Sequence, residues 1–509
     1  MFKRLTAFAL KRRPIESSQL KRMNAGCIRE PVVSPSICYK TGATLFFGVG
    51  AGVALVGFFV YSSTVHADAG SNRVAPRHGN GEPLPRGIRG LFCTQTNSFG
   101  EDRISTGYAK SLGYYCIGIY DGHNGCGTAE TLSALLPRVA IKALSLLYSW
   151  YSTYHSAFDV ATQAYLTAGI ILQNNIPPDI LIDLFIRTSF LFIDKQVADG
   201  TVDKLLDFDD GSYEELHAYI NTGTENALPT TAARPPRSHE INDDVAFVRS
   251  SSCAIVGLFN TVDRSLRVGL VGDSRAVLGR RIAVKNGGQY EAHILTVDQS
   301  ISNPIQIEHL TADSEHPDRP HLLKGHRATR AFGDGSLKFP VVTTLKDVKP
   351  GDFAVFASGG LSDCLTSEEV IGLVGQWLEQ RGTTEFISDE LGNTNVIRVP
   401  SSIKISRTTL PNRVSEIIAT DSFPSDSKTC LPSELPVIYP PSYNDTTMMY
   451  KRWSSSKKFV CVDDDVVVHL MRNALGGANH ELRSRLMSMN MPEAGKHRDD
   501  ITITVLFFD

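Results

Sequence analysis

Short apolar runs and stretches of helical periodicity follow one another from residue 91 to the C-terminus. Runs rich in β-branched and aromatic residues predict strands at 114–120, 252–259, 266–271, 275–278, 353–357 and 502–508. Apolar positions three or four residues apart predict helices at 129–147, 179–197, 368–379 and 464–475. Paired strands followed by helices, without a regular strand–helix alternation, indicate a layered α+β fold.

The N-terminal part of the chain differs in kind from the rest. Residues 1–40 contain many Lys and Arg but only Glu16 and Glu30 as acidic residues, which predicts a mitochondrial targeting presequence. Residues 43–61 contain no charged residue and are just long enough to span a bilayer, so they predict a transmembrane helix within 41–63. The basic flank is then expected on the matrix or cytosolic side of the membrane.

This segment leaves alternatives open. A signal anchor of the endoplasmic reticulum is the alternative to an anchor in the mitochondrial inner membrane. Retention of the anchor would place the rest of the chain in the intermembrane space, whereas cleavage after it would allow a matrix location. Gly48 and Gly52 have the spacing that supports dimerisation of membrane helices, or they reflect how common glycine is in such helices.

Composition beyond the membrane segment predicts one large domain. Residues 64–90 are rich in Gly, Pro and Arg and predict a linker before a domain at 91–509. A polar, proline-containing stretch near 200–245 and a Ser/Thr/Pro-rich stretch near 380–458 predict insertions into that domain.

Charge and cysteine content exclude several classes of protein. Hydrophobic residues make up 42% of the 509 residues, enough for a sizeable core, and the net charge is −3. Because the basic residues form no patch with interleaved aromatics, a nucleic-acid partner is not expected. The nine cysteines are scattered without a Cys-x-x-Cys pair, which argues against a zinc site or a disulfide framework and favours buried or inert thiols.

Aspartates occur where several of the predicted strands end. Asp121 follows the strand at 114–120, Asp273 separates two strands, Asp499 precedes the last strand, and Asp102 lies upstream of all three. Carboxylates that converge from strand ends can hold hard divalent cations, because Mg²⁺ and Mn²⁺ prefer oxygen ligands on a rigid frame. The pattern therefore predicts a site for Mg²⁺ or Mn²⁺.

These aspartates belong to five short motifs that follow one another along the chain. The motifs are Glu101-Asp102, Asp121-Gly122-His123-Asn124-Gly125, Gly272-Asp273-Ser274-Arg275, Arg330-Ala331-Phe332-Gly333-Asp334 and Asp499-Asp500-Ile501-Thr502. In this order they resemble the metal-dependent serine/threonine protein phosphatases, the PPM or protein phosphatase 2C family, over residues 91–509. The resemblance implies a phosphoprotein substrate and a four-layer αββα sandwich of two antiparallel sheets flanked by helices.

One subgroup of this family is more similar than the rest. Asn97 lies four residues before Glu101, where most of the family has an arginine that holds the substrate phosphate. The mitochondrial pyruvate dehydrogenase phosphatases have an asparagine there, and they also resemble this chain at Gly125-Cys126 and over 468–474. The resemblance implies a weak phosphate contact for Asn97 and, as substrate, a phosphoserine on the E1 component of pyruvate dehydrogenase. A location in the intermembrane space fits that matrix substrate poorly.

The resemblance further implies two cations and a role for each site residue. The implied metal positions are Asp102, Asp121, Gly122, Asp273, Asp363 and Asp499. Asp121 would bridge both cations, Asp102 would act through a bound water, and Asp273 and Asp363 match carboxylates of a weaker third site. Water activated between the two cations would attack phosphorus in line, and His123 would protonate the leaving serine or threonine oxygen. Alternatively, Asp273 is a turn residue and His123 a capping or packing residue.

Gly359 departs from the family pattern. The family usually reads Asp-Gly-Leu-Trp where this chain has Gly359-Gly360-Leu361-Ser362, so one direct ligand of the second cation and one large packing group are missing. A water could take the place of that ligand with a loss of affinity, because Mg²⁺ retains several waters in its protein sites.

Two functions of different classes are therefore expected. The first is a working mitochondrial phosphatase with a weakened second metal site, and the retained carboxylates and His123 favour it. The second is a pseudophosphatase that keeps the sandwich as a binding module, and Gly359 favours it. A third, a membrane scaffold that acts through 380–458, has no support beyond the length of that segment.

Overall fold

The chain divides into two units, 1–55 and 56–509. The computed structural model describes residues 85–96, 100–165, 177–202, 214–217, 250–284, 287–301, 303, 305–306, 328–333, 340–380, 385–388, 395–398, 406–408, 414–415, 417–418, 429–489, 494 and 497–509. The expected presequence, transmembrane helix and most of the expected linker lie outside these residues, as do Gly48 and Gly52.

One six-stranded sheet, sheet A, contains both the first and the last strand of the domain. Its order is β13-β1-β16-β10-β7-β8, and every neighbouring pair is antiparallel except β1 and β13. The strands are β1 Ile88–Gln95, β7 Arg275–Val284, β8 Gly287–Ile294, β10 Phe353–Ala357, β13 Ser406–Thr408 and β16 Thr502–Phe508. The C-terminal strand β16 therefore lies in the interior of sheet A, between β1 and β10.

The second six-stranded sheet, sheet B, is antiparallel throughout. Its order is β4-β2-β3-β5-β6-β9. The strands are β2 Arg103–Ala109, β3 Tyr114–His123, β4 Glu214–His217, β5 Ser251–Asn260, β6 Leu266–Val271 and β9 Val341–Leu345. β3 and β5 pair over ten residues each, which places the Asp121 end of β3 beside Cys253.

The two sheets pack face to face on an apolar core. Leu91 and Leu506 of sheet A and Ile117 and Ile255 of sheet B belong to one buried cluster. The sheets approach so closely that a Cβ atom on Gly257 of β5 would lie 2.5 Å from the ring of Phe356 on β10. Close packing of this kind is what alternating inward-facing side chains of two stacked sheets produce.

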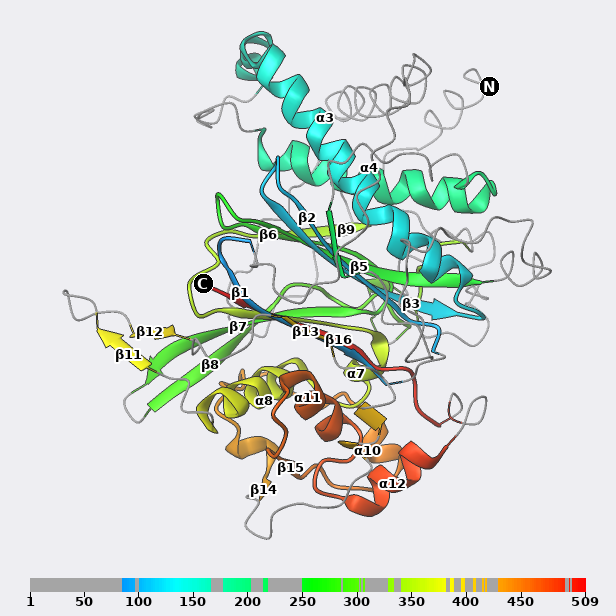
Figure 1. The fold of residues 1–509 in the computed structure, drawn as a ribbon, viewed down its shortest axis with the longest axis vertical. Coiled ribbons are helices and arrows are strands. Elements are labelled where there is room, and N and C mark those ends of the chain that lie inside the picture. The colour runs from blue at the N-terminus through cyan, green and yellow to red at the C-terminus, as the bar shows by residue number, and fades with distance from the viewer. Residues whose placement is uncertain are drawn as a thin grey trace, which may run out of the picture. The chain divides into compact units, whose positions relative to one another are not determined.

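Helices cover the outer face of each sheet (Figure 1). α3 (Gly127–Tyr165) and α4 (Asp179–Ala198) pack on sheet B, where a Cβ atom on Gly269 would lie 2.7 Å from the ring of Phe190. α8 (Ser367–Gln380) and α11 (Val466–Ala474) pack on sheet A, where the Trp377 ring stacks on Phe507 with centroids 6.3 Å apart. The expected αββα sandwich is confirmed.

Shorter elements complete the helical layer over sheet A. They are α7 Gly359–Ser362, the 3₁₀ helix η2 Pro432–Glu434, α10 Met449–Arg452, α12 His480–Ser488 and the two-stranded pair β14 Thr429–Cys430 with β15 Phe459–Val460. A further two-stranded pair, β11 Glu385–Ser388 with β12 Asn395–Arg398, lies apart from these helices in Figure 1. The segment 380–458 thus supplies one strand of sheet A, β13, as well as part of its helical cover.

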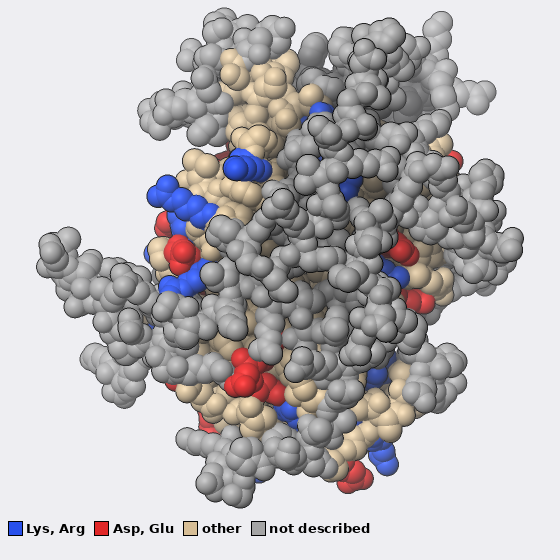
Figure 2. Space-filling model, in the orientation of Figure 1, with Lys and Arg blue, Asp and Glu red and all other residues tan. Residues whose placement is uncertain are grey.

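Two further features of the described chain are its apolar helical stretch and the distribution of its charged side chains. One stretch of the described chain, Gly127–Ser152, is long and apolar enough to cross a membrane. It is the first part of α3, whose buried side packs against sheet B. On the face drawn in Figure 2, the described Lys and Arg side chains lie among Asp and Glu side chains.

Candidate metal and catalytic site

The predicted site residues lie where strands of both sheets begin or end. Asp121 is near the end of β3 and Asp102 directly precedes β2, both in sheet B. Asp499 lies three residues before β16 of sheet A, and Asp273 is in the turn that carries the chain from β6 of sheet B to β7 of sheet A. The sandwich therefore brings together carboxylates that are separated by up to several hundred residues in the sequence.

Asp102 and Asp121 are the most deeply buried of these carboxylates, with 1% and 2% of their surface exposed. The Thr502 hydroxyl donates a hydrogen bond of 2.6 Å to Asp102 Oδ2. The peptide N–H of Gly359 donates a hydrogen bond of 3.1 Å to Asp121 Oδ2. Each carboxylate is thus held by a group from sheet A or from the loop that follows β10.

The buried carboxylates repel one another. Burial raises the pKa of Asp121 well above its usual range, and the negative charges of Asp499 and Asp273 raise it further. The pKa of Asp102 is also raised well above its usual range, first by burial and then by the charges of Asp121 and Asp500. Like charges held this close in a protein interior are an unfavourable arrangement that a cation among them relieves.

The chemistry of this donor set fits a hard divalent cation. The groups brought together are carboxylate oxygens, which are ligands that Mg²⁺ and Mn²⁺ prefer, and the resemblance adds the peptide carbonyl of Gly122 as an expected donor. Within the described part of the chain, no group of three or more His, Cys, Asp or Glu side chains is arranged as a set of metal ligands. The fit therefore rests on donor type and mutual repulsion.

Two glycines allow the loops of the site to approach one another. A Cβ atom on Gly122 would lie 2.4 Å from the carbonyl oxygen of Glu101, and one on Gly360 would lie 2.1 Å from the carbonyl oxygen of Asp500. Such contacts are possible only without a side chain. The loop is closed further by the peptide N–H of Glu101, which donates a hydrogen bond of 3.1 Å to Asp500 Oδ2. Asp500 therefore supports the loop.

His123 lies between a carboxylate and a thiol. Its Nδ1 is 3.6 Å from Asp121 Oδ1, and its Nε2 is 3.4 Å from Cys253 Sγ. The Cys253 thiol also lies 3.5 Å from Asp273 Oδ1. Cys253 is buried, as expected of most cysteines in this chain, but its place beside the site residues was not predicted. The signal that finds it is strand register, because Cys253 is the partner of Asp121 across β3 and β5.

Gly359 is directed into the site. A Cβ atom built on it would lie 3.4 Å from both Asp121 Oδ2 and Asp273 Oδ1, which is ordinary van der Waals contact. Position 359 thus faces the same space as the two carboxylates, although the native residue presents only its N–H.

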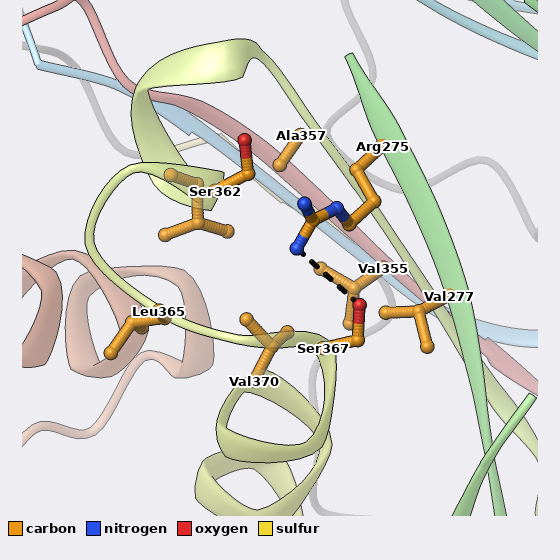
Figure 3. Close-up of a pocket in the computed structure, with 9 residues that line it drawn as sticks. Arg275, Val277, Val355, Ala357, Ser362, Leu365, Ser367 and Val370 are labelled. Carbon is orange, nitrogen blue, oxygen red and sulfur yellow. Dashed lines mark hydrogen bonds between the residues drawn. The ribbon is translucent and has the colours of Figure 1, made fainter. Parts of the chain in front are cut away.

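Ser362 and Asp363 stand at the other end of α7. Ser362 lines a small pocket between α7, α8 and sheet A, together with Arg275, Val277, Val355, Ala357, Leu361, Leu365, Ser367 and Val370 (Figure 3). The pocket is mostly apolar, as expected where a tryptophan of the family pattern is replaced by serine. Asp363 donates its peptide N–H to the Gly359 carbonyl, and its charge is not among the leading causes that raise the pKa of Asp121.

Two residues of the expected motifs cannot be placed. Asn97, the expected phosphate contact, and Asp334 lie outside the described residues. Thr96 and Gly333, their neighbours within the described chain, are held by hydrogen bonds to Ile501 and to the Asp194 carboxylate, respectively.

Known proteins are similar to this chain in sequence. A model of the family described as protein phosphatase 2C matches residues 195–397. The mitochondrial pyruvate dehydrogenase (acetyl-transferring) phosphatase 1 of Saccharomyces cerevisiae is 26% identical over 77% of this chain and 62% of its own length. A protein phosphatase 2C homologue of Schizosaccharomyces pombe is 25% identical over 78% of this chain and 74% of its own length.

Among solved structures, the serine-threonine phosphatase 2C of Toxoplasma gondii aligns with 84% of this chain and 99% of its own, at 15% identity and a TM-score of 0.37. The range matched by the family model includes the motifs at 272–275 and 330–334. Over these residues the chain is similar to the protein phosphatase 2C family, and among its relatives is a mitochondrial pyruvate dehydrogenase phosphatase.

Proposed function

We propose that this chain is a metal-dependent protein phosphatase that hydrolyses phosphoserine and phosphothreonine on mitochondrial proteins. The observation that carries the proposal is the mutually repelling carboxylate cluster around the buried Asp121 and Asp102, built from both sheets. A fold that keeps two such carboxylates buried loses stability, and a functional site is the usual reason for that loss.

In this proposal Asp121, Asp499 and the Gly122 carbonyl hold Mg²⁺ or Mn²⁺, and Asp273 adds a further carboxylate. Asp102, which is fully buried and accepts the Thr502 hydroxyl, orients water at the edge of the cluster. A bound divalent cation supplies positive charge for the phosphoryl oxygens and lowers the pKa of water. The proposal also includes Asp363 as a carboxylate ligand of a weaker third cation site.

His123 is the residue that we assign to proton transfer. It is only partly exposed, and its ring lies beside Asp121, so it can deliver a proton to a leaving oxygen that enters the cluster from solvent.

A second candidate function, a pseudophosphatase that binds phosphoproteins or other partners without turnover, is favoured by one observation. Gly359 offers an N–H to Asp121 where the family pattern has a carboxylate. That N–H partly satisfies Asp121 without a cation. The two candidates differ in whether the remaining oxygens bind cations tightly enough for turnover.

The relative from Saccharomyces cerevisiae suggests the substrate class. We propose phosphoserine on the E1 component of pyruvate dehydrogenase, or on another mitochondrial protein, as substrate. Residues 1–40 support import, and residues 41–63 support attachment to the inner membrane, facing the matrix or the intermembrane space. An anchor in the endoplasmic reticulum and a dimer through Gly48 and Gly52 are the alternatives for this segment.

The proposal is tested with the purified full-length chain and a phosphoserine peptide. Phosphate release should require added Mn²⁺ or Mg²⁺, and Asp121→Asn should lower kcat/KM by at least about 100-fold because it removes a ligand at the centre of the cluster. Asp199→Asn, which alters an exposed carboxylate on α4, is the control and should leave turnover unchanged. Cation binding without detectable turnover at millimolar Mn²⁺ would establish the pseudophosphatase instead.

A further inference from the structure

A strand from the segment 380–458 runs beside β1 toward the candidate site. β13 pairs with β1 in parallel, with Leu91 opposite Ser406 and Cys93 opposite Thr408. Because the two strands run in the same direction, the chain that follows β13 leaves sheet A at the same end as Gln95 and Thr96. That is the end at which the carboxylate loops lie.

The described residues after β13 reach the turn that precedes those loops. We call residues 414, 415, 417 and 418 the anchor segment. Val414 and Ile418 are fully buried in the core under α8 and α11. Between them, the Ser415 hydroxyl donates a hydrogen bond of 3.3 Å to the carbonyl oxygen of Thr96.

Thr96 in turn is bound twice to the loop that carries Asp499 and Asp500. Its N–H donates to the Ile501 carbonyl at 2.9 Å, and the Ile501 N–H donates to Thr96 Oγ1 at 3.0 Å. Thr96 therefore links the end of β1 to the start of β16. Ser415 contacts this link from the side of the anchor segment.

A buried arginine holds the anchor segment from the other side. Arg472 of α11 is 3% exposed and forms a two-pronged ion pair with Asp463, at 2.8–3.1 Å. Its remaining donors bind the carbonyl oxygens of Ile417 at 2.8 Å and Ile418 at 3.4 Å. Arginine suits this position because its planar fork can satisfy a carboxylate and backbone carbonyls at the same time.

We propose that the anchor segment is a positioning element of the candidate site, with Ser415 and Arg472 as its positioning residues. The segment fixes the Thr96–Ile501 link, and through it the carboxylate loops on either side. This assigns a role to the motif at 468–474, which contains Arg472. The effect on catalysis rests on the proposed phosphatase function, whereas the hydrogen bonds of Ser415 and Arg472 are independent of that function.

The proposal has a physical basis in how hard cations bind. Mg²⁺ demands oxygens at 2.0–2.1 Å in nearly ideal geometry. Releasing the Thr96 carbonyl lets the start of β16 move, and Asp499 moves with it. A small displacement of one carboxylate then weakens cation binding even though the fold is intact.

The test compares variants of the purified full-length chain. Ser415→Ala removes the hydroxyl, and Ser415→Thr restores it. The double variant Arg472→Met/Asp463→Leu, called the clamp variant, removes the ion pair and the arginine's hydrogen bonds to the anchor segment without leaving a buried unpaired charge. Its matched control is Lys457→Met/Glu369→Leu, which removes another buried ion pair of the same helical layer, with Nζ to oxygen distances of 2.7 and 3.0 Å.

Amide hydrogen exchange at Thr96 and Ile501 is the first readout, and Mn²⁺ affinity by calorimetry is the second. Ser415→Ala and the clamp variant should speed exchange at both amides and raise the Kd for Mn²⁺. The expected change is about tenfold, which corresponds to the loss of one typical hydrogen bond. Ser415→Thr should behave as the native chain. The control pair should leave exchange at these two amides unchanged.

The outcomes separate this inference from the proposed function. Unchanged exchange at Thr96 and Ile501 in Ser415→Ala and in the clamp variant overturns the positioning role, whatever the activity. A native chain that binds no Mn²⁺ and releases no phosphate refutes the phosphatase, while the exchange data still decide the inference. If the clamp variant does not fold, the comparison of Ser415→Ala with Ser415→Thr decides it.

Discussion

At the scale of single residues, two adjacent glycines in the candidate site differ in whether a side chain would fit there. Gly359 has room for a side chain, since its Cβ atom would be in ordinary contact with Asp121 and Asp273. Gly360 has none, because its Cβ atom would lie 2.1 Å from the Asp500 carbonyl oxygen. Neighbouring positions with opposite tolerance allow the metal site and the backbone packing to be tested separately.

Gly359→Asp should strengthen cation binding. The new carboxylate would enter the space between Asp121 and Asp273, and we expect a fall in the Kd for Mn²⁺ of about tenfold or more, or a second resolved site, because each added anionic oxygen favours a hard cation. Calorimetric titration of the full-length chain measures this. Gly359→Ala, which adds the Cβ atom without an oxygen, is the control. Equal affinities in the two variants would contradict the metal-site assignment.

Gly360→Ala should destabilise the fold. The added methyl group meets a backbone atom that cannot rotate away, and overpacking of this kind costs about 1–3 kcal/mol of unfolding free energy. Urea denaturation measures the loss. Gly359→Ala should differ from the native chain by much less. A stable Gly360→Ala would show that the loop at Asp500 shifts freely, and the site would then not be rigid.

At the scale of elements, α7 connects two departures from the family pattern. Gly359 begins this helix inside the carboxylate cluster, and Ser362 ends it against the apolar pocket in Figure 3. The Ser362 hydroxyl turns back to the Gly359 carbonyl at 2.9 Å and does not fill the pocket with apolar volume. Both ends of α7 have thus lost packing or ligand atoms.

Ser362→Trp should stabilise the fold. An indole at this position would cover Val277, Val355 and Val370 and would gain about 1 kcal/mol of unfolding free energy, as is common for cavity-filling changes. Chemical denaturation of the native chain, Ser362→Trp and Ser362→Ala measures the effect. The alanine variant removes the hydroxyl without filling the pocket. A tryptophan variant less stable than the alanine variant would show that the pocket does not accept the ring.

The elements that could be predicted from sequence are those whose burial pattern is local. Central strands such as β5 and β16 are buried on both faces, so they can be recognised in the sequence as apolar runs. β8 and β13 were missed, because Gly287–Ile294 contains glycine and polar residues and Ser406–Thr408 has only three. They become strands only because sheet A offers them an edge.

The candidate site followed the same division. Asp102 and Asp121 could be found from motifs, and their burial agrees with a functional role. The Thr502 hydroxyl on Asp102 and the Cys253 thiol beside His123 could not, because these contacts join residues 400 and 130 positions apart. The packing of sheet A on sheet B brings Thr502 to Asp102, and the register of β3 and β5 brings Cys253 to His123; no local pattern encodes either.

At the scale of the whole molecule, the described part of the helical layer over sheet A contains buried ion pairs centred on Lys457 and on Arg472. Lys457 is bonded to Glu369 and lies 3.1 Å from Asp445, and Arg472 is bonded to Asp463. Buried pairs contribute little net stability compared with apolar replacements, but the loss of one partner is severe. These pairs therefore specify how the layer fits sheet A more than they strengthen it.

Lys457→Met should lower the unfolding free energy by about 3–5 kcal/mol, because it leaves Glu369 buried without its cation. The double variant Lys457→Met/Glu369→Leu should regain most of that loss. Urea denaturation of both variants and the native chain measures the difference. If the single and double variants prove equally stable, water or Thr366 must satisfy Glu369, and the ion pair is dispensable.

The N-terminal unit should direct the chain to mitochondria. Residues 1–63 fused to a fluorescent protein are expected to reach the mitochondrial membrane fraction, because the basic, acid-poor leader has the character of a presequence. Residues 41–63 alone serve as the control and should lose that destination. Fluorescence in the endoplasmic reticulum from the 1–63 fusion would support the signal-anchor alternative.

The interior position of β16 has a consequence for how the chain is made. This strand follows β1 by several hundred residues, yet it lies between β1 and β10 and is buried along its whole length. A growing chain therefore cannot close sheet A or assemble the carboxylate cluster until Thr502–Phe508 has been synthesised, since β1 and β10 lack the strand between them. Until then sheet A stays open, and an open chain is the form that can be threaded through a membrane before it folds.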